Sequence, residues 1–422
     1  MRMPSLLFVV LAVALFASGA RAEPSAPATV AEDVRLLGNS LATIHPEPFR
    51  SISEQRFRSE VETLARQAPS LRPNELLVGL LRIVALLGPR NGHTGIFPLD
   101  PANARELHPY PLRLYEFGDG VFVVDESGDL GLVGSRLVAV AGVPIANVLE
   151  RVRPLVPHDN PSSLRGLALH YLLVAEVLDG LGVVDGAGPA ELTFERANGA
   201  SVRVTLEPLA PSAYRAAFAD PLTGHYPAVL PSAARPLYLA SSAKPLWART
   251  LANGRAVYVG YNAVIPPTPA VMRTIDRLVR GKSVRRVIVD LRRNGGGDNT
   301  TYGPLTTLLG SPRVDRRGRL YLLIGRATFS AAANFAAEID RYTRAIFVGE
   351  PTGGGVEAYG DSFRVLLPST GFNVYIATRY HDRRRGPNDR RLAVEADVPI
   401  DVTSADYFAG RDPVLERALQ GL

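Results

Sequence analysis

Three segments of the chain combine glycines with polar side chains, and each follows a run of apolar residues. The first, residues 290–298, reads Asp-Leu-Arg-Arg-Asn, then three glycines and an aspartate. Consecutive glycines let backbone amides approach a ligand closely and point together, which suits a phosphate or an oxyanion. No Gly-Lys-Ser/Thr follows, so the segment does not match a nucleotide-binding loop. The first segment is therefore better interpreted as an oxyanion site.

The second segment, residues 325–334, places Ser330 after an apolar run and directly before three alanines. This pattern predicts a serine at a strand-to-helix turn, where free amides and the helix dipole favour an alkoxide or an adjacent oxyanion. Serine is also a common helix cap, and the local sequence leaves that interpretation open. The third segment, residues 347–355, leads from an apolar run into another glycine-rich turn and by itself predicts only a loop.

Composition removes several other chemistries. The chain has no cysteine, which excludes thiol catalysis, thiolate zinc sites and disulfides. Lysine occurs only at Lys244 and Lys282, so a mechanism that needs lysine has two candidates. The histidines at positions 108, 158, 170 and 225 share no metal-like spacing. Neither a metal site nor a cofactor is expected.

The first 22 residues have the features of an export signal. Arg2 precedes an apolar run from Leu6 to Ala17, and a small-x-small cleavage site ends at Ala22. We therefore predict a signal peptide over residues 1–22 and a periplasmic or secreted protein, with a retained membrane anchor as the alternative. The apolar run is shorter than the ~20 residues of a membrane span. Cleavage removes two arginines and changes the net charge from +6 to +4, too mild and scattered to indicate nucleic-acid binding.

The 422 residues indicate two to three domains, and the sequence pattern changes twice after the signal. Residues 30–95 have apolar positions at helical spacing and predict a helical cap that ends in a Gly-His-Thr turn. Residues 112–208 contain short β runs, with an Asn198-Gly199 hairpin signal. Residues 210–422 predict an α/β catalytic domain. Its expected strands are 257–259, 287–291, 321–324, 346–348, 363–367 and 374–377, and its expected helices are 271–280, 302–309 and 331–342.

Within the β-rich region, residues 132–145 resemble the core of a PDZ domain. Ser135 stands where that family usually has aspartate. A PDZ-like sheet captures an extended peptide by strand addition, with main-chain hydrogen bonds supplying the affinity. A β-rich spacer without a ligand is the alternative interpretation.

Taken together and in this order, the loops resemble the tail-specific (C-terminal-processing) serine protease family, including its tricorn-like and interphotoreceptor-retinoid-binding branch. The family's Asp-Leu-Arg-x-Asn-x-Gly-Gly matches residues 290–297, and its Thr-x-Ser-Ala matches 328–331. Its Val-Gly-Glu-x-Thr-x-Gly matches 348–354, the branch's Gly-His-Thr matches 92–94, and its closing Val-x-Pro-Asp region is similar to 394–397. The resemblance covers nearly the whole mature chain.

The resemblance implies a ββα-type α/β catalytic domain with a PDZ-like module and a helical cap, and it makes Ser330 the nucleophile. Family members with a Ser-Lys dyad carry lysine where this chain has Gly355, and no lysine follows Lys282. The acidic residue that often follows the nucleophile turn is replaced by Ala333. A lysine base in that loop is therefore excluded.

The tricorn-like branch uses a histidine base oriented by a later acid, which implies His93 as the base. For the orienting acid the resemblance leaves Asp389 and Glu395, of which Asp389 is ranked first. The amides of Gly296 and Ala331 are the expected oxyanion donors.

The sequence thus predicts an exported serine-type peptidase that acts on polypeptide substrates. A catalytically silent protein that binds peptides or another ligand on the same scaffold is the main alternative, and a hydrolase of non-peptide bonds is another. The bond cleaved, the oligomeric state and the role of the PDZ-like module stay open at this stage.

Overall fold

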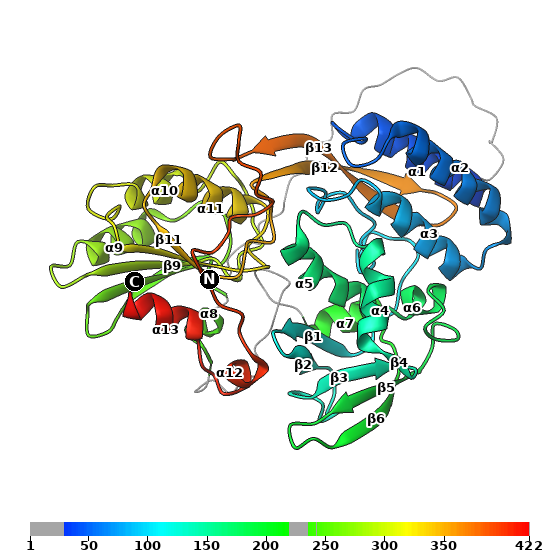
Figure 1. Cartoon of the computed structure of the whole chain (residues 1–422), viewed down its shortest axis with the longest axis horizontal. Coiled ribbons are helices and arrows are strands. Elements are labelled where there is room, and N and C mark those ends of the chain that lie inside the picture. The colour runs from blue at the N-terminus through cyan, green and yellow to red at the C-terminus, as the bar shows by residue number, and fades with distance from the viewer. Residues whose placement is uncertain (1–28, 219–234, 242, 422) are drawn as a thin grey trace, which may run out of the picture.

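The computed structural model of the chain describes residues 29–218, 235–241 and 243–421. The predicted signal peptide, residues 1–22, lies outside the described residues. No helix in the described ranges is both long and apolar enough to cross a membrane. Along the described chain a helical region, a β-rich module and an α/β region follow one another (Figure 1).

The helical region begins at a capping box, in which the Thr29 side chain accepts from the amide of Glu32. Its first helix ends at Ile44, one residue before the His45-Pro46 pair, because proline pushes the preceding residue out of the α conformation. The helices of this region are α1 (Val30–Ile44), α2 (Glu54–Gln67), the 3₁₀ turn η1 (Ala68–Ser70) and α3 (Pro73–Ala85).

The module is an antiparallel sheet in the order β1-β2-β3-β5-β6, with β4 paired to β3. The predicted hairpin at Asn198-Gly199 is confirmed, because β5 and β6 pair in register on either side of it. Peptide capture by this sheet stays a prediction. The module's elements are β1 (Leu112–Phe117), β2 (Gly120–Glu126), β3 (Arg136–Val140), β4 (Val143–Pro144), α4 (Ile145–Val152), η2 (Arg153–Leu155), α5 (Pro161–Leu172), α6 (Ala175–Gly180), β5 (Ala190–Glu195) and β6 (Ser201–Leu206).

The α/β region is built on a six-stranded sheet in the order β14-β11-β10-β9-β8-β7, parallel except for β7. Side chains alternate across the sheet, so Val287 and Val289 of β9 face one apolar core and Ile288 faces another. Helices α9, α10 and α11 cover the first face and α13 the second. The strands are β7 (Leu246–Leu251), β8 (Ala256–Tyr261), β9 (Arg286–Asp290), β10 (Leu320–Ile324), β11 (Ile346–Gly349) and β14 (Val398–Pro399). The helices are α8 (Leu237–Ala240), α9 (Pro269–Val279), α10 (Gly303–Leu309), α11 (Ala331–Tyr342), α12 (Ser404–Phe408) and α13 (Pro413–Gln420). The preceding helix α7 (Pro211–Phe218) lies beside the module, where its Tyr214 hydroxyl donates to the Leu112 carbonyl of β1.

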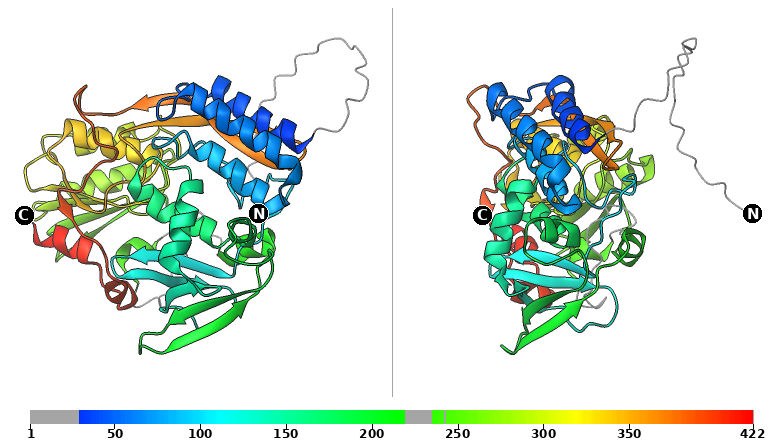
Figure 2. Two further views of the ribbon diagram at one scale, coloured as in Figure 1. Left: turned by 45° about the vertical axis from the view of Figure 1, so that its right-hand side comes forward. Right: turned by 90° about the vertical axis from the view of Figure 1, so that its right-hand side faces the viewer.

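One long hairpin leaves the α/β region. Its strands, β12 (Glu357–Leu367) and β13 (Phe372–Asp382), form a separate two-stranded sheet and pack against α1 (Figure 2). Buried residues of the helical region, the module and the end of this hairpin belong to one continuous apolar core. The helical region and the module therefore share a core, and the chain segment that carries the third glycine-rich loop is tied to both.

Candidate active site

The three glycine-rich segments follow β9, β10 and β11, which are neighbouring parallel strands. The carboxyl ends of parallel strands meet at one edge of a sheet, so the three loops lie together there. Three hydrogen bonds join them: the Thr328 hydroxyl donates to the Leu291 carbonyl, the Phe329 amide donates to the Asn294 carbonyl, and the Gly354 amide donates to the Thr328 carbonyl. The second loop is thus held between the other two.

Ser330 occupies a sharp strand-to-helix turn between β10 and α11. Its φ of 51° and ψ of −128° lie in a region that non-glycine residues rarely adopt. The hydroxyl makes no capping hydrogen bond to α11, so the interpretation of Ser330 as a simple helix cap does not hold. Its Oγ instead lies 3.0 Å from Nε2 of His93. A serine on such a strained strand-to-helix turn resembles the geometry of a nucleophile elbow.

Close approach of the first loop to the serine depends on Gly296. Its φ is 110°, and a Cβ at this position would lie 2.7 Å from the Cβ of Ser330. The Gly296 amide donates to Asn294 Oδ1 at 3.0 Å, so this predicted oxyanion donor is already engaged within its own loop. The Ala331 amide opens α11 and has no acceptor one turn back in the helix.

His93 is held by the Gly-His-Thr turn. The Thr94 hydroxyl accepts from the Ala377 amide of β13, and the His93 carbonyl accepts from the Ser362 hydroxyl of β12. Gly92 has no room for a side chain, because a Cβ there would lie 2.8 Å from the ring of Phe329 and 3.0 Å from Asp159 Oδ1. The imidazole stacks on the Phe329 ring with centroids 4.7 Å apart. The turn and the ring stack together aim Nε2 at Ser330.

The second ring nitrogen of His93 is unusual. Nδ1 is buried and has no hydrogen-bond partner among the described residues. Neither acid expected from sequence contacts it there. The Asp389 carboxylate binds the Arg391 guanidinium and the Arg385 amide, and Arg391 holds the pKa of that carboxyl far below its usual range. Glu395 is exposed. Arginines that flank Asp389 in the chain thus engage it away from the histidine.

A different carboxylate lies at the site. Asp159 is 0% exposed, and its two oxygens accept from the amides of Gly92 (2.7 Å) and Gly355 (3.2 Å). Burial raises the pKa of Asp159, while the charge of His93 and these two hydrogen bonds act in the opposite direction. Sequence reasoning missed this residue, because it directly precedes Asn160, whose side chain caps α5, and so looked like part of an ordinary helix start.

Two cavities adjoin His93. One, of about 240 Å³, has a mostly polar lining that includes Ser330, Asp159 and His381. The other, of about 370 Å³, is mostly apolar, and Leu167 and Tyr375 contribute to it. Both cavities include His93. A peptide bound across both cavities would therefore contact a mostly apolar surface on one side of His93 and a mostly polar surface on the other.

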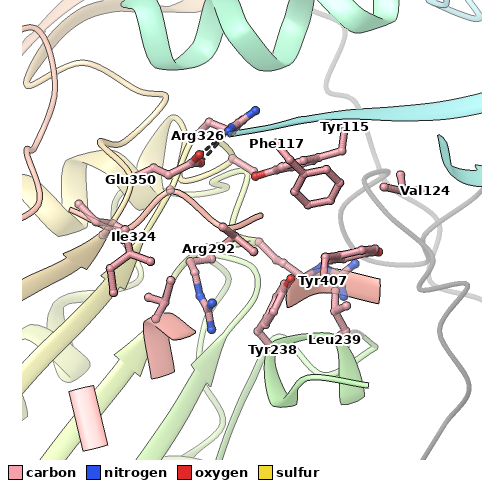
Figure 3. Close-up of a pocket in the computed structure, with 17 residues that line it drawn as sticks. Tyr115, Phe117, Val124, Tyr238, Leu239, Arg292, Ile324, Arg326, Glu350 and Tyr407 are labelled. Carbon is pink, nitrogen blue, oxygen red and sulfur yellow. Dashed lines mark hydrogen bonds and ion pairs between the residues drawn. The ribbon is translucent and has the colours of Figure 1, made fainter. Parts of the chain in front are cut away.

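A third pocket lies where the module meets the α/β region (Figure 3). There the Arg326 guanidinium, in the second loop, pairs with Glu350 of the third loop and lies 4.4 Å from the Tyr115 ring centre. Arg326 also donates to the main-chain carbonyl of Glu116 in β1. The position of the loop that carries Ser330 is thus fixed in part by the module. Within the described part of the chain, no cluster of three histidine or acidic side chains could hold a metal ion.

A serine at a positive-φ turn with a histidine at hydrogen-bond distance is an arrangement that serine hydrolases use. Residues 299–399, which include Ser330 and Gly355, match the model of Peptidase family S41. Mature CPAF complexed with lactacystin is similar in structure, with a TM-score of 0.64 and 15% identity over 93% of this chain and 97% of that chain. Another structure of mature CPAF has a TM-score of 0.61 and 16% identity, and the match covers 90% of this chain and 94% of that chain. The photosystem II D1 C-terminal processing protease gives a TM-score of only 0.40, with 15% identity over 92% and 99%.

The family match over residues 299–399 and the fold shared with CPAF support a serine-type peptidase of the tail-specific protease family. The family and the α/β fold class predicted from the ordered motifs are confirmed.

Proposed function

We propose that this protein hydrolyses peptide bonds with Ser330 as the nucleophile and His93 as the general base. The observation that carries the proposal is the 3.0 Å contact between Ser330 Oγ and His93 Nε2. The distance lies within the range for proton transfer along a hydrogen bond. The contact joins residues far apart in the chain, and both belong to turns that the surrounding loops hold in place.

In the proposed reaction Ser330 Oγ attacks the carbonyl carbon of the scissile bond and gives its proton to His93 Nε2. The tetrahedral intermediate collapses when the imidazolium returns that proton to the leaving amine, which releases the first product and leaves an acyl ester on Ser330. A water molecule then attacks the carbonyl carbon of this ester and gives its proton to His93. His93 returns the proton to Ser330 Oγ, and the second product leaves as the acid.

For the oxyanion we propose the Ala331 amide as one donor, because it stands at the positive end of the α11 dipole. Gly296 was the second donor expected from sequence, but its amide binds Asn294. Gly297, which lines the same cavity as Ser330, is the better second candidate. Gly296 then serves to let the loop approach the serine.

The mostly apolar cavity beside His93 supports binding of a bulky apolar side chain next to the cleaved bond. We expect Leu167→Asp to lower kcat/KM for peptides with Phe or Leu at that position by about 10- to 100-fold, because a carboxylate replaces apolar lining. Peptides with glycine there should lose much less. Steady-state kinetics on such matched peptides, with Leu36→Asp on the exposed side of α1 as control, measure the difference. An equal loss for all peptides would contradict this assignment of the cavity.

The activity itself is tested with unfolded casein and a fluorogenic peptide. Ser330→Ala should abolish hydrolysis while the protein keeps its melting temperature, since the hydroxyl makes no helix cap. Ser283→Ala, at an exposed serine whose hydroxyl donates to the Gly254 carbonyl, should behave as wild type. Full activity in Ser330→Ala would refute the proposed nucleophile.

We also propose export to the periplasm or cell exterior, on the strength of the predicted signal over residues 1–22. N-terminal sequencing of protein recovered from producing cells should start at Glu23. Recovery of the unprocessed chain from the cytoplasm alone would contradict the proposal.

A further inference from the structure

The proposed reaction places a positive charge on the half-buried ring of His93. An imidazolium formed beside apolar surroundings is costly unless a negative charge lies near it. The ring stacks on Phe329 on one side, and Nδ1 is buried without a hydrogen-bond partner among the described residues. The site therefore requires an acid close to this ring, and Asp389 is engaged by arginines elsewhere.

Asp159 meets that requirement by position. It is fully buried, it lines the same cavity as His93 and Ser330, and its Oδ1 accepts from the amide of the residue directly before His93. Its other oxygen accepts from the amide of Gly355, the position at which a lysine would complete a Ser-Lys dyad. Apart from these two neutral amides, the titratable groups that act on it are His93 and His158.

The backbone around Asp159 is held by the turn that carries His93 and by the third glycine-rich loop. The Arg90 amide donates to the Asp159 carbonyl at 2.9 Å, and the Asn91 amide donates to the His158 carbonyl at 3.0 Å. On the other side, Asn160 Nδ2 donates to the carbonyls of the third loop, including that of Gly353 at 3.0 Å. A carboxyl group held this firmly, with no guanidinium partner among the described residues, is placed so that its charge would act on the histidine.

We propose that Asp159 is the positioning acid of this peptidase: it holds the His93 turn through the Gly92 amide and stabilises the charged imidazole when Ser330 attacks. This inference rests on the proposed function and replaces Asp389 in that role. Asp159 acts on His93 through its charge and through the turn, and not by a direct hydrogen bond to Nδ1.

The test compares Asp159→Asn with Asp33→Asn. Asp33 of α1 is a matched control, since it is 1% exposed and accepts two hydrogen bonds from Thr370 in the turn between β12 and β13. For Asp159→Asn we expect kcat to fall by about 10²- to 10⁴-fold with KM changed less than about threefold. The acid limb of kcat/KM should move to lower pH, because the imidazolium has lost its nearby negative charge; His381 and Asp361, which line the same cavity, are unchanged. Asp33→Asn should alter neither quantity.

A second variant separates positioning from mere packing. In Asp159→Ala, added formate should restore activity in a saturable manner, whereas neutral formamide of similar size should not. Equal effects of the two additives, or an Asp159→Asn variant with wild-type kcat and pH profile, would overturn the inference. If Asp389→Asn lowers kcat and shifts the acid limb of kcat/KM to lower pH, while Asp159→Asn changes neither, the positioning acid is Asp389.

The two proposals fail in different ways. If Ser330→Ala or His93→Ala retains wild-type activity, the proposed function fails and the role of Asp159 fails with it. If both are inactive while Asp159→Asn is fully active, only the inference about Asp159 is wrong.

Discussion

Replacement of His93 by alanine is expected to lower kcat for peptide hydrolysis by about 10⁴- to 10⁶-fold, with the melting temperature retained. The imidazole is the group within hydrogen-bond distance of the serine hydroxyl, and its removal leaves Ser330 without a base. The Gly-His-Thr turn should survive, because main-chain atoms of His93 and the Thr94 hydroxyl make its bonds to β12 and β13. Stopped peptide assays over a range of pH should also show that the profile of kcat/KM for His93→Ala lacks the acid limb of the wild-type profile.

The lysines are the matched controls for that experiment. Lys244 and Lys282 are the only lysines in the chain, and both are exposed. Lys244→Ala and Lys282→Ala should therefore leave kcat within about twofold of wild type. An active His93→Ala, or a folded lysine variant that has lost activity, would show that the base has been assigned to the wrong residue.

A lysine introduced at position 355, where family members with a Ser-Lys dyad carry it, should not act as a base in this protein. At Gly355 a Cβ would lie 2.4 Å from the Glu357 carbonyl oxygen and 3.2 Å from that of Leu392, so the loop must shift to admit any side chain. We expect Gly355→Lys to inactivate the enzyme and to destabilise it by about 2–4 kcal/mol, because backbone atoms cannot yield as a flexible side chain would. Denaturant unfolding and peptide assays measure the two effects.

The control for this change is Gly386→Lys, where a Cβ meets nothing within 4 Å. That variant should be folded and active. The informative combination is His93→Ala with Gly355→Lys: it should be as inactive as His93→Ala alone. Recovery of activity in the double variant would show that the scaffold accepts a lysine base after all.

The catalytic loops could be predicted because their signals are local. Apolar runs that end in glycines indicate strands followed by close-approach loops, and neighbouring parallel strands bring such loops to one edge. Ser330 was ambiguous in sequence, since a helix cap and a nucleophile have the same pattern. Its positive φ and its missing cap bond separate the two interpretations, and neither is visible in the sequence.

Asp159 could not be found in this way. Its contacts are with Gly92 and Gly355, which lie 67 and 196 residues away in the chain. Its local sequence indicates a helix start, and a buried carboxylate in such a segment is indistinguishable from an exposed one by residue type. Gly296 is a similar case, because its amide is turned to Asn294 by loop geometry that no motif specifies.

The alternation of apolar and polar residues predicts a strand but does not determine which sheet the strand joins. Residues 363–367 and 374–377 were expected as strands of the α/β region, and they are strands. They belong instead to a separate hairpin that packs on α1 and carries Ser362 to the His93 carbonyl. The period of a strand fixes which residues share a face, but not which neighbour the strand pairs with.

Activation of Ser330 as a nucleophile by His93 is measured by treating the protein with a fluorophosphonate probe and locating the adduct by peptide mass spectrometry. We expect one covalent adduct on Ser330, formed much more slowly in His93→Ala and absent from Ser330→Ala. An adduct on another residue, or wild-type protein that neither reacts with the probe nor cleaves any peptide, would contradict this expectation, and the second result would favour a silent binding protein on this scaffold.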